Sequence, residues 1–234
     1  MTGIFKKEWG HYFKTMTGFV FIAMYLALSG AVFSMTNLLS QSADIKSYFS
    51  VFTTYVIFLF PILTMGVFSE ERRQKTDELL FTAPVSLTAV VLGKFFATLC
   101  VFLLPMLITL VYPVILSRFG VSAVFETAGN YLGLAMLAMA CIAIGEFLSL
   151  LTDSQFVAAM MTYSIFALLL FAGMAIPMVP QGMIASLLSF FAITTHCAGF
   201  SYGVFDLTQV VYFLSITALF LYLSIFVLEL RRLS

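Results

Sequence analysis

The side chains that could do chemistry gather mainly in one stretch of this 234-residue chain. Residues 69–78 read SEERRQKTDE and carry charges of both signs. The chain has no HExxH or GxSxG motif, and it has no GxxxxGK[ST] phosphate cradle, because Gly93-Lys94 is followed by Phe95 and position 88 is threonine. Its three cysteines form no CxxC pair. The sequence therefore predicts that the chain is not an enzyme, holds no metal and hydrolyses no nucleotide by itself.

The hydrophilic stretch leads into a short amphipathic segment, residues 76–83. Thr76 fits an N-cap, Glu78 falls in the first turn, where the helix dipole favours a carboxylate, and Pro84 ends the helix. The apolar side chains that this helix presents beside its charges are Leu79, Leu80 and Phe81. An apolar anchor with a polar rim suits a groove on a soluble partner. A solvated loop whose leucines rest on the membrane fits the same residues.

The composition requires a membrane protein. Hydrophobic residues make up 62% of the chain and charged residues 9%, whereas a soluble domain has about 25% charged residues. Eleven basic residues balance eleven acidic ones, so no net charge attracts nucleic acid. A helix needs about 20 apolar residues to cross the hydrocarbon core of a bilayer. Runs of this kind occupy residues 17–36, 48–68, 95–116, 130–151, 156–178 and 209–228.

The few charged residues indicate the orientation of these spans. Placing both termini in the cytoplasm puts nine basic residues inside and only Lys46 and Arg118 outside, in agreement with the positive-inside rule. Of the 22 charged residues, only Glu146 lies within an apolar run. Its carboxyl group could snorkel to the interface, pair with a basic residue of a neighbouring span, or face a water-filled part of a translocation path.

Two further segments are expected to lie along the membrane surface. In residues 4–16 the aromatic residues Phe5, Trp9, Tyr12 and Phe13 share one side of a helix and the charged residues the other. This pattern predicts an interfacial helix at the inner leaflet, because the aromatic stripe is more than orientation alone requires. The alternative is an ordinary basic flank that only follows the positive-inside rule. The outer segment 179–208 is mostly apolar but includes no run long enough to cross, so we expect it to lie at the interface or to dip back into the membrane.

Three stretches of the sequence resemble one family of membrane proteins. They are EERRQKTDELLFTAPVS (70–86) with VLGKF (91–95), IGEFLSLLTDSQFVAA (144–159), and the tail from His196 through GVFDL (203–207) to LELRR (228–232). Together they resemble the ABC-2 type permeases, the membrane subunits of ATP-binding-cassette exporters, and are similar to the gliding-motility F-type group. Lys75 and Glu146 depart from that group, which usually has a small and an apolar residue there.

The resemblance implies a role for each segment of a single transmembrane domain covering residues 1–234. Residues 4–16 would be the connecting helix, 76–83 the coupling helix seated on a separate ATPase subunit, and 181–207 the outer re-entrant helices. Two ATPases would bind ATP and Mg²⁺, so this chain would need no cofactor. The coupling residues implied are Glu70, Glu71, Arg72, Arg73, Thr76, Glu78, Leu79, Leu80, Phe81 and Pro84.

The same resemblance implies partners and a location. The permease would pair with a second six-span half, either a copy of itself or a related chain, in the bilayer of a bacterial cell membrane. An accessory extracytoplasmic protein would be compatible with this arrangement. The leading hypothesis is therefore the permease subunit of an ABC exporter, and the alternative is a membrane scaffold that docks a soluble partner without transport. A self-powered carrier is disfavoured by the scarcity of charge within the spans.

The topology can be tested directly. A cysteine introduced at Leu80, in a chain whose native cysteines are replaced, should react with a membrane-impermeant thiol reagent only in inside-out vesicles. A cysteine at Lys46 is the matched control and should react only from the outer side of intact cells. Labelling of position 80 in intact cells would contradict the predicted orientation.

Overall fold

The computed structural model describes residues 2–41, 44–75, 86–118, 124–179, 182–183, 188–190, 192–193, 196 and 207–233. Within these residues the chain is helical and has no strand. Six stretches are long and apolar enough to cross a membrane, which confirms the predicted all-α class with six spans. The stretches are Thr17–Leu38, Ile45–Arg73, Leu87–Leu116, Phe125–Leu151, Gln155–Met178 and Leu207–Arg232. The predicted coupling helix 76–83 lies outside the described residues, as does most of the segment 181–207.

Several spans are assembled from more than one helical piece. The elements are α1 (Thr2–Lys14), α2 (Thr17–Phe33) with a π-helical turn (Ser34–Leu38), α3 (Ile45–Val56), a 3₁₀ turn (Ile57–Leu59), α4 (Phe60–Thr64), α5 (Ser69–Arg73), α7 (Leu87–Ile108), α8 (Val111–Leu116), α9 (Val124–Leu151), α10 (Gln155–Ala175) with a 3₁₀ turn (Ile176–Met178), and α13 (Leu207–Leu233). The second span is interrupted by a turn at 65–68, so α5 is a separate short helix.

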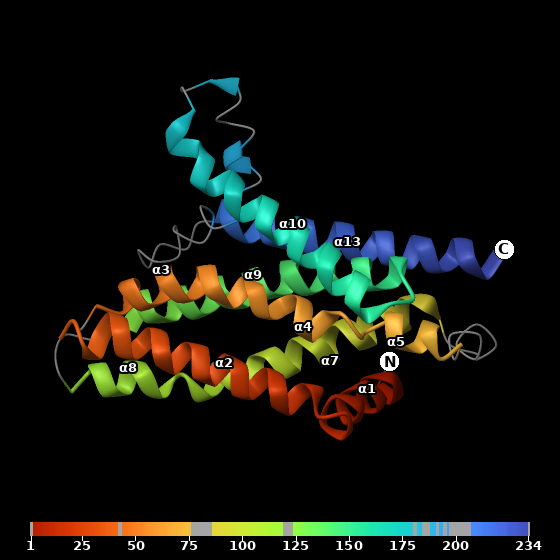
Figure 1. The fold of residues 1–234 in the computed structure, drawn as a ribbon, viewed down its shortest axis with the longest axis horizontal. Coiled ribbons are helices and arrows are strands. Elements are labelled where there is room, and N and C mark those ends of the chain that lie inside the picture. Colours follow the sequence, from red (N-terminus) through yellow and green to blue (C-terminus); the bar gives the residue numbers. More distant parts are fainter. Residues whose placement is uncertain are drawn as a thin grey trace.

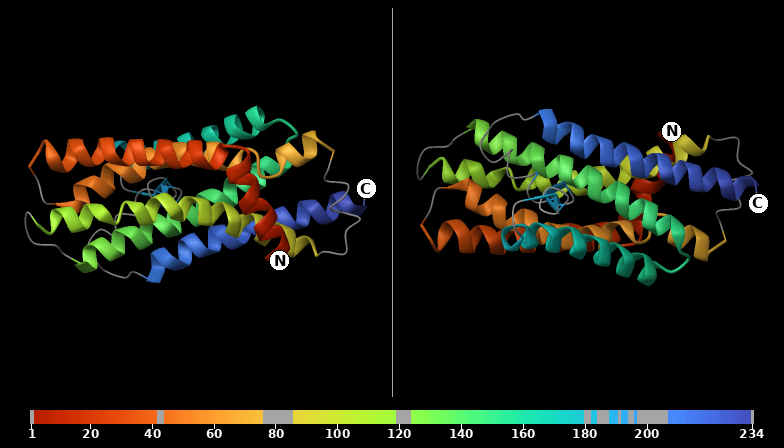
Figure 2. Two further views of the ribbon diagram at one scale, coloured as in Figure 1. Left: turned by 90° about the horizontal axis from the view of Figure 1, so that it is seen from below. Right: turned by 90° about the horizontal axis from the view of Figure 1, so that it is seen from above.

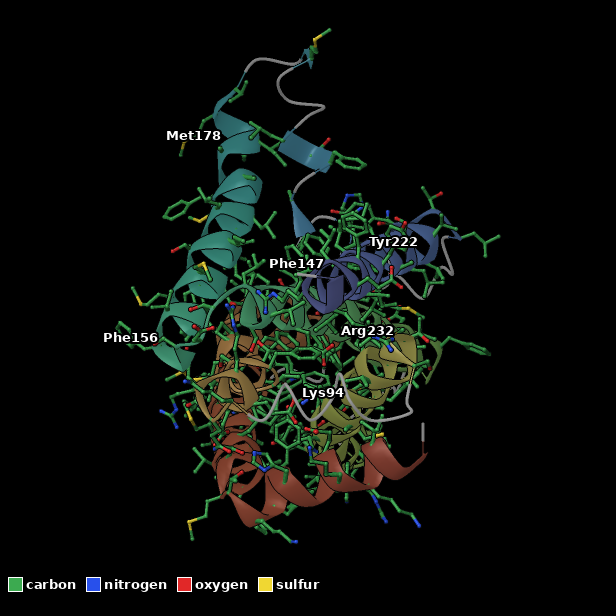
Figure 3. All side chains as sticks on the ribbon, turned by 90° about the vertical axis from the view of Figure 1, so that its right-hand side faces the viewer. Lys94, Phe147, Phe156, Met178, Tyr222 and Arg232 are labelled. Carbon is green, nitrogen blue, oxygen red and sulfur yellow. The ribbon has the colours of Figure 1, made fainter. Side chains whose placement is uncertain are left out.

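The span containing α9 is the centre of the bundle. Its most apolar window is 72% buried, the largest share of any span, and α9 contacts α3, α4, α7, α10 and α13. By contrast, α10 is only 17% buried and leaves the bundle at an angle (Figure 1). Seen from the end where both termini lie, α1 and α10 flank the bundle on opposite sides (Figure 3). We call this end the α1 end.

Aromatic rings fill the space between α2, α3 and α7. Tyr25 is fully buried, and its ring makes edge-on contacts with Phe52 at 5.2 Å and Phe102 at 5.5 Å between centroids. Phe60 of α4 stacks on Phe102 at 5.1 Å. Such ring pairs are favourable beyond the area that they bury. Interhelical packing of this kind is what holds helices together in lipid, where the hydrophobic effect gives little.

A tight corner turns α1 out of line with α2. Met16, between the two helices, has a left-handed backbone with φ 61°. Gly18 follows it, and a Cβ there would lie 2.9 Å from the Tyr12 carbonyl oxygen, so only glycine allows the approach. As a result α1 crosses obliquely over α7 (Figure 2) and packs against it along much of its length.

Two helices, α7 and α9, begin well before the apolar runs that predicted them. The third span was expected at 95–116, but α7 starts at Leu87 and includes Lys94. The fourth was expected at 130–151, but α9 starts at Val124 and includes Glu126. Lys94 directly precedes the expected third span, and Glu126 lies four residues before the expected fourth span. Both side chains form ion pairs within the protein, Lys94 with Glu8 and Glu126 with Lys46.

A close approach between α4 and α9 predicts a sensitive position. A Cβ on Gly145 of α9 would lie 2.7 Å from the Thr64 Cβ and would also overlap its hydroxyl. Gly145→Ala should therefore lower the free energy of unfolding by about 1–3 kcal/mol through overpacking. Gly30→Ala is the matched control, because its nearest neighbour would be the Tyr112 hydroxyl at 3.8 Å. That change should be neutral or stabilise the helix by up to about 1 kcal/mol. Thermal unfolding in detergent measures both, and equal melting temperatures would contradict the tight contact.

Candidate functional site

A buried lysine lies at the centre of the α1 end. Lys94 of α7 is 2% exposed, and its Nζ donates to the Val67 carbonyl oxygen at 2.7 Å. Nζ also pairs with Glu71 Oε2 at 2.9 Å and with Glu8 Oε1 at 3.2 Å. These acceptors satisfy all three N–H groups of the ammonium, which is the condition for keeping such a charge out of water. They belong to α1, the turn after α4, and α5, so one side chain joins three elements to α7. Figure 3 labels Lys94 in the part of the bundle next to α1.

A second layer of charge connects α1 with α5. Lys7 Nζ lies 3.0 Å from Glu71 Oε1, and His11 Nε2 lies 3.4 Å from Glu70 Oε2. Burial by itself would lower the pKa of Lys7, but the hydrogen bond and negative charge of Glu71 outweigh it and raise the pKa above its ordinary value. Lys7 therefore stays charged throughout the physiological pH range. The predicted polar side of α1 thus faces the carboxylates of α5, and Glu8 is buried between them.

A line of hydroxyl groups continues from this cluster into the bundle. The Tyr12 hydroxyl lies 3.2 Å from the Leu63 carbonyl oxygen and 3.0 Å from Thr98 Oγ1. Thr98 Oγ1 in turn donates to Glu146 Oε1 at 3.3 Å. Burial raises the pKa of Tyr12, so its hydroxyl keeps the proton that it donates. The line joins α1, α7 and α9 at a level deeper than Lys94.

Glu146 lies at the inner end of this line. Its side chain is fully buried, and Oε2 has no hydrogen-bond partner among the described residues. Of the three settings considered from the sequence, snorkelling to the interface does not match this burial. The contact that the structure gives is with Thr98, a neutral hydroxyl of the third span.

The start of α5 is held from the other side by α9. Ser149 Oγ accepts from the backbone N–H groups of Phe68 and Ser69, at 3.2 and 3.1 Å, and donates to the Met65 carbonyl oxygen at 3.0 Å. The first N–H groups of a helix have no partner within the helix. One buried serine therefore satisfies the N-terminus of α5 and fixes its position on α9.

Two arginines make further contacts at this end of the bundle, one from α5 and one from α13. Arg72 forms an ion pair with Asp153, in the turn between α9 and α10. Arg231, near the end of α13, donates to the Leu150 carbonyl oxygen at 2.8 Å. This bond satisfies one of the free carbonyl groups at the C-terminus of α9. All elements of the α1 end are thereby tied to α5 or to the helix on which α5 rests.

A cavity of about 490 Å³ opens between α1, α4, α5 and α7. Its charged and polar lining includes Glu70, Glu71, Lys94 and Gln155, and its apolar lining includes Ile62 and Val90. Among the described residues, no group of three or more His, Cys, Asp or Glu side chains is placed to hold a metal ion. The lining of the cavity thus mixes charged, polar and apolar side chains.

The structure brings together part of the predicted site. Glu70, Glu71 and Arg72 lie in the network, whereas Arg73 is exposed. Tyr12 was expected among the membrane-facing rings but is buried against Leu63. The other three rings of α1 are half-buried and contact one another, with centroids 6.1 and 5.2 Å apart. The predicted residues outside the described part of the chain are Thr76, Glu78, Leu79, Leu80, Phe81 and Pro84.

Several residues of the network were not singled out as site residues from the sequence: Lys7, Glu8, His11, Lys94, Thr98, Ser149, Asp153 and Arg231. Lys94 carried a signal that could have found it. It is preceded by the apolar residues Val90, Val91 and Leu92 and followed by Phe95, so a lysine there had to be buried and paired. Nothing in the sequence marks which of the many serines and threonines would be buried at a helix end.

Comparison with known families agrees with this architecture. The family model described as ABC-2 family transporter protein matches residues 31–228, which is most of the chain. The chain belongs to the ABC-2 transporter family. A comparison with curated proteins found no match. Membership of the ABC-2 family makes the chain the membrane permease domain and not the ATPase, and it implies an ATPase partner.

The anchoring of α5 in this permease can be tested with one hydroxyl group. Ser149→Ala leaves two buried backbone N–H groups without an acceptor, so it should lower the free energy of unfolding by about 1–3 kcal/mol. Ser164→Ala is the matched control, because Ser164 is exposed and bonds only to its own helix at Met160. That variant should stay within about 0.5 kcal/mol of wild type. Thermal unfolding in detergent measures both, and an unchanged Ser149→Ala variant would contradict the anchor.

Proposed function

We propose that this permease is the membrane subunit of an exporter, which uses ATP hydrolysis by a separate ATPase subunit to move its substrate out of the cell. The observation that carries the proposal is the fixation of α5. This helix has only five residues, yet α1, α7, α9 and the turn before α10 all bond to it. A segment that receives force from a partner outside the membrane must be held firmly by the helices around it, as α5 is.

The docking element would be the segment that follows α5. Residues 76–83 carry the apolar anchor Leu79 beside the acidic residues Asp77 and Glu78, and their sequence resembles the coupling helix of ABC-2 permeases. We infer that this segment seats in a cleft of the ATPase, which holds ATP and Mg²⁺. The excess of basic residues at this end supports a cytoplasmic location for it and for both termini.

The remaining assignments follow from the family resemblance. We infer a functional unit of two permease halves and two ATPases in a bacterial cell membrane, with the second half either a copy of this chain or a relative. Resemblance to the gliding-motility F-type group supports this arrangement, and an accessory extracytoplasmic protein is compatible with it. The apolar spans offer no feature that selects one substrate class.

Co-purification tests the proposal. Tagged permease should bring down an ATPase from its native membrane, and Leu79→Asp should weaken that complex by about 2 kcal/mol, or roughly 30-fold in Kd, because it removes a central apolar anchor. Leu39→Asp is the matched control, since Leu39 is 78% exposed in another loop. It should leave the complex intact. The measurements are the amount of ATPase recovered and its turnover rate.

The scaffold alternative predicts a different result. A bound partner without nucleotide hydrolysis, or an ATPase whose turnover does not respond to Glu78→Lys and Leu79→Asp, would contradict coupling through residues 76–83.

A further inference from the structure

Lys94 connects the helices on the two sides of the segment that would dock the ATPase, α5 before it and α7 after it. The segment follows α5 in the chain and precedes α7. Lys94, two turns into α7, bonds to Val67 and Glu71, which precede the segment, at 2.7 and 2.9 Å. A buried ammonium group therefore joins α5 to the first turns of α7, and we expect these two elements to move together.

The same ammonium is the first of two matched contacts between α7 and α1. Glu8 and Tyr12 are four residues apart on α1, and they bond to Lys94 and Thr98, four residues apart on α7, at 3.2 and 3.0 Å. Residues with this spacing lie on one face of a helix. Both contacts are buried, and the second leads on to Glu146 of α9.

The other links between α5 and α1 are weaker. Lys7 is 66% exposed and His11 is 45% exposed in their pairs with α5 carboxylates. Exposed ion pairs hold little energy, whereas breaking a buried one is costly. Lys94 is thus the main mechanical connection from α5 to α1.

We propose that Lys94 is a positioning residue that carries nucleotide-dependent movement of the α5 segment to α1 and, through Thr98, to the interior at Glu146. The inference rests on the proposed function, because it assumes that an ATPase moves this segment. When the ATPase displaces α5, the ammonium keeps Glu71 and Glu8 at a fixed separation, so α1 follows. Without it, α5 moves and α1 stays.

Hydrogen exchange of the whole transporter tests this transmission. The permease–ATPase complex is compared in the nucleotide-free state and after trapping with ADP and vanadate, and amide exchange is measured at residues 69–75 and 2–14. In wild type, trapping should change exchange in both segments. In Lys94→Met the change at 69–75 should persist, and the change at 2–14 should be lost.

Two further variants make the result specific. Glu8→Leu removes only the bond from Lys94 to α1 and leaves Lys94 with two acceptors, Val67 and Glu71. It should therefore also abolish the nucleotide-dependent change in exchange at residues 2–14. This variant decides the question if Lys94→Met does not assemble with the ATPase. Lys46→Met is the matched control. It removes an ion pair to Glu126 of 3.1 Å, away from the α1 end, and should behave as wild type.

The outcomes separate the two proposals. A purely structural role for Lys94 would raise exchange of α1 in both states but keep the nucleotide-dependent difference, and that result would overturn the inference. If trapping changes the exchange of the wild-type protein at residues 69–75 but not at 2–14, the inference about Lys94 is also overturned, while the proposed function stands. If trapping does not change the exchange of the wild-type protein at residues 69–75, the proposed coupling of the ATPase to this segment is overturned, and with it the role of Lys94.

Discussion

The architecture of the α1 end depends on keeping one ammonium group out of water. Removing a lysine charge from water costs several kcal/mol unless its donors are satisfied. Lys94 meets this condition only if Glu8, Glu71 and the Val67 carbonyl converge on it. That convergence fixes α1 across α7, the turn after α4, and the position of α5, so a single electrostatic requirement determines the geometry of four elements.

The short helix α5 illustrates how polar groups serve as tertiary contacts in an apolar bundle. Five residues are too few for a stable isolated helix. Here Ser149 satisfies the first N–H groups of α5, Glu71 bonds to two lysines, and Arg72 pairs with Asp153. The helix is therefore held by its surroundings, and a force applied to it passes into them.

The amphipathic helix α1 combines two surroundings that its sequence pattern does not distinguish. The aromatic rings of Phe5, Trp9 and Phe13 are half-buried along one side, as suits an interfacial helix. On its charged side, Lys7 pairs with a carboxylate of α5 and Glu8 with the ammonium of Lys94. In the proposed exporter, this makes α1 a part of the transmission as well as a membrane anchor.

The sequence by itself determined the all-helical class, the six spans and the short charged segment between the second and third, because lipid demands long apolar helices and leaves charge only at their ends. It did not reveal the network around Lys94, the hydroxyl line to Glu146, or the early starts of α7 and α9. Residue type indicates that a buried charge must be paired, but Glu8 lies 86 residues from Lys94 in the sequence. Similarly, Ser149 lies 81 and 80 residues from Phe68 and Ser69, whose backbone N–H groups donate to it. Only the tertiary structure decides such pairs, since they depend on how the helices cross and not on their spacing along the chain.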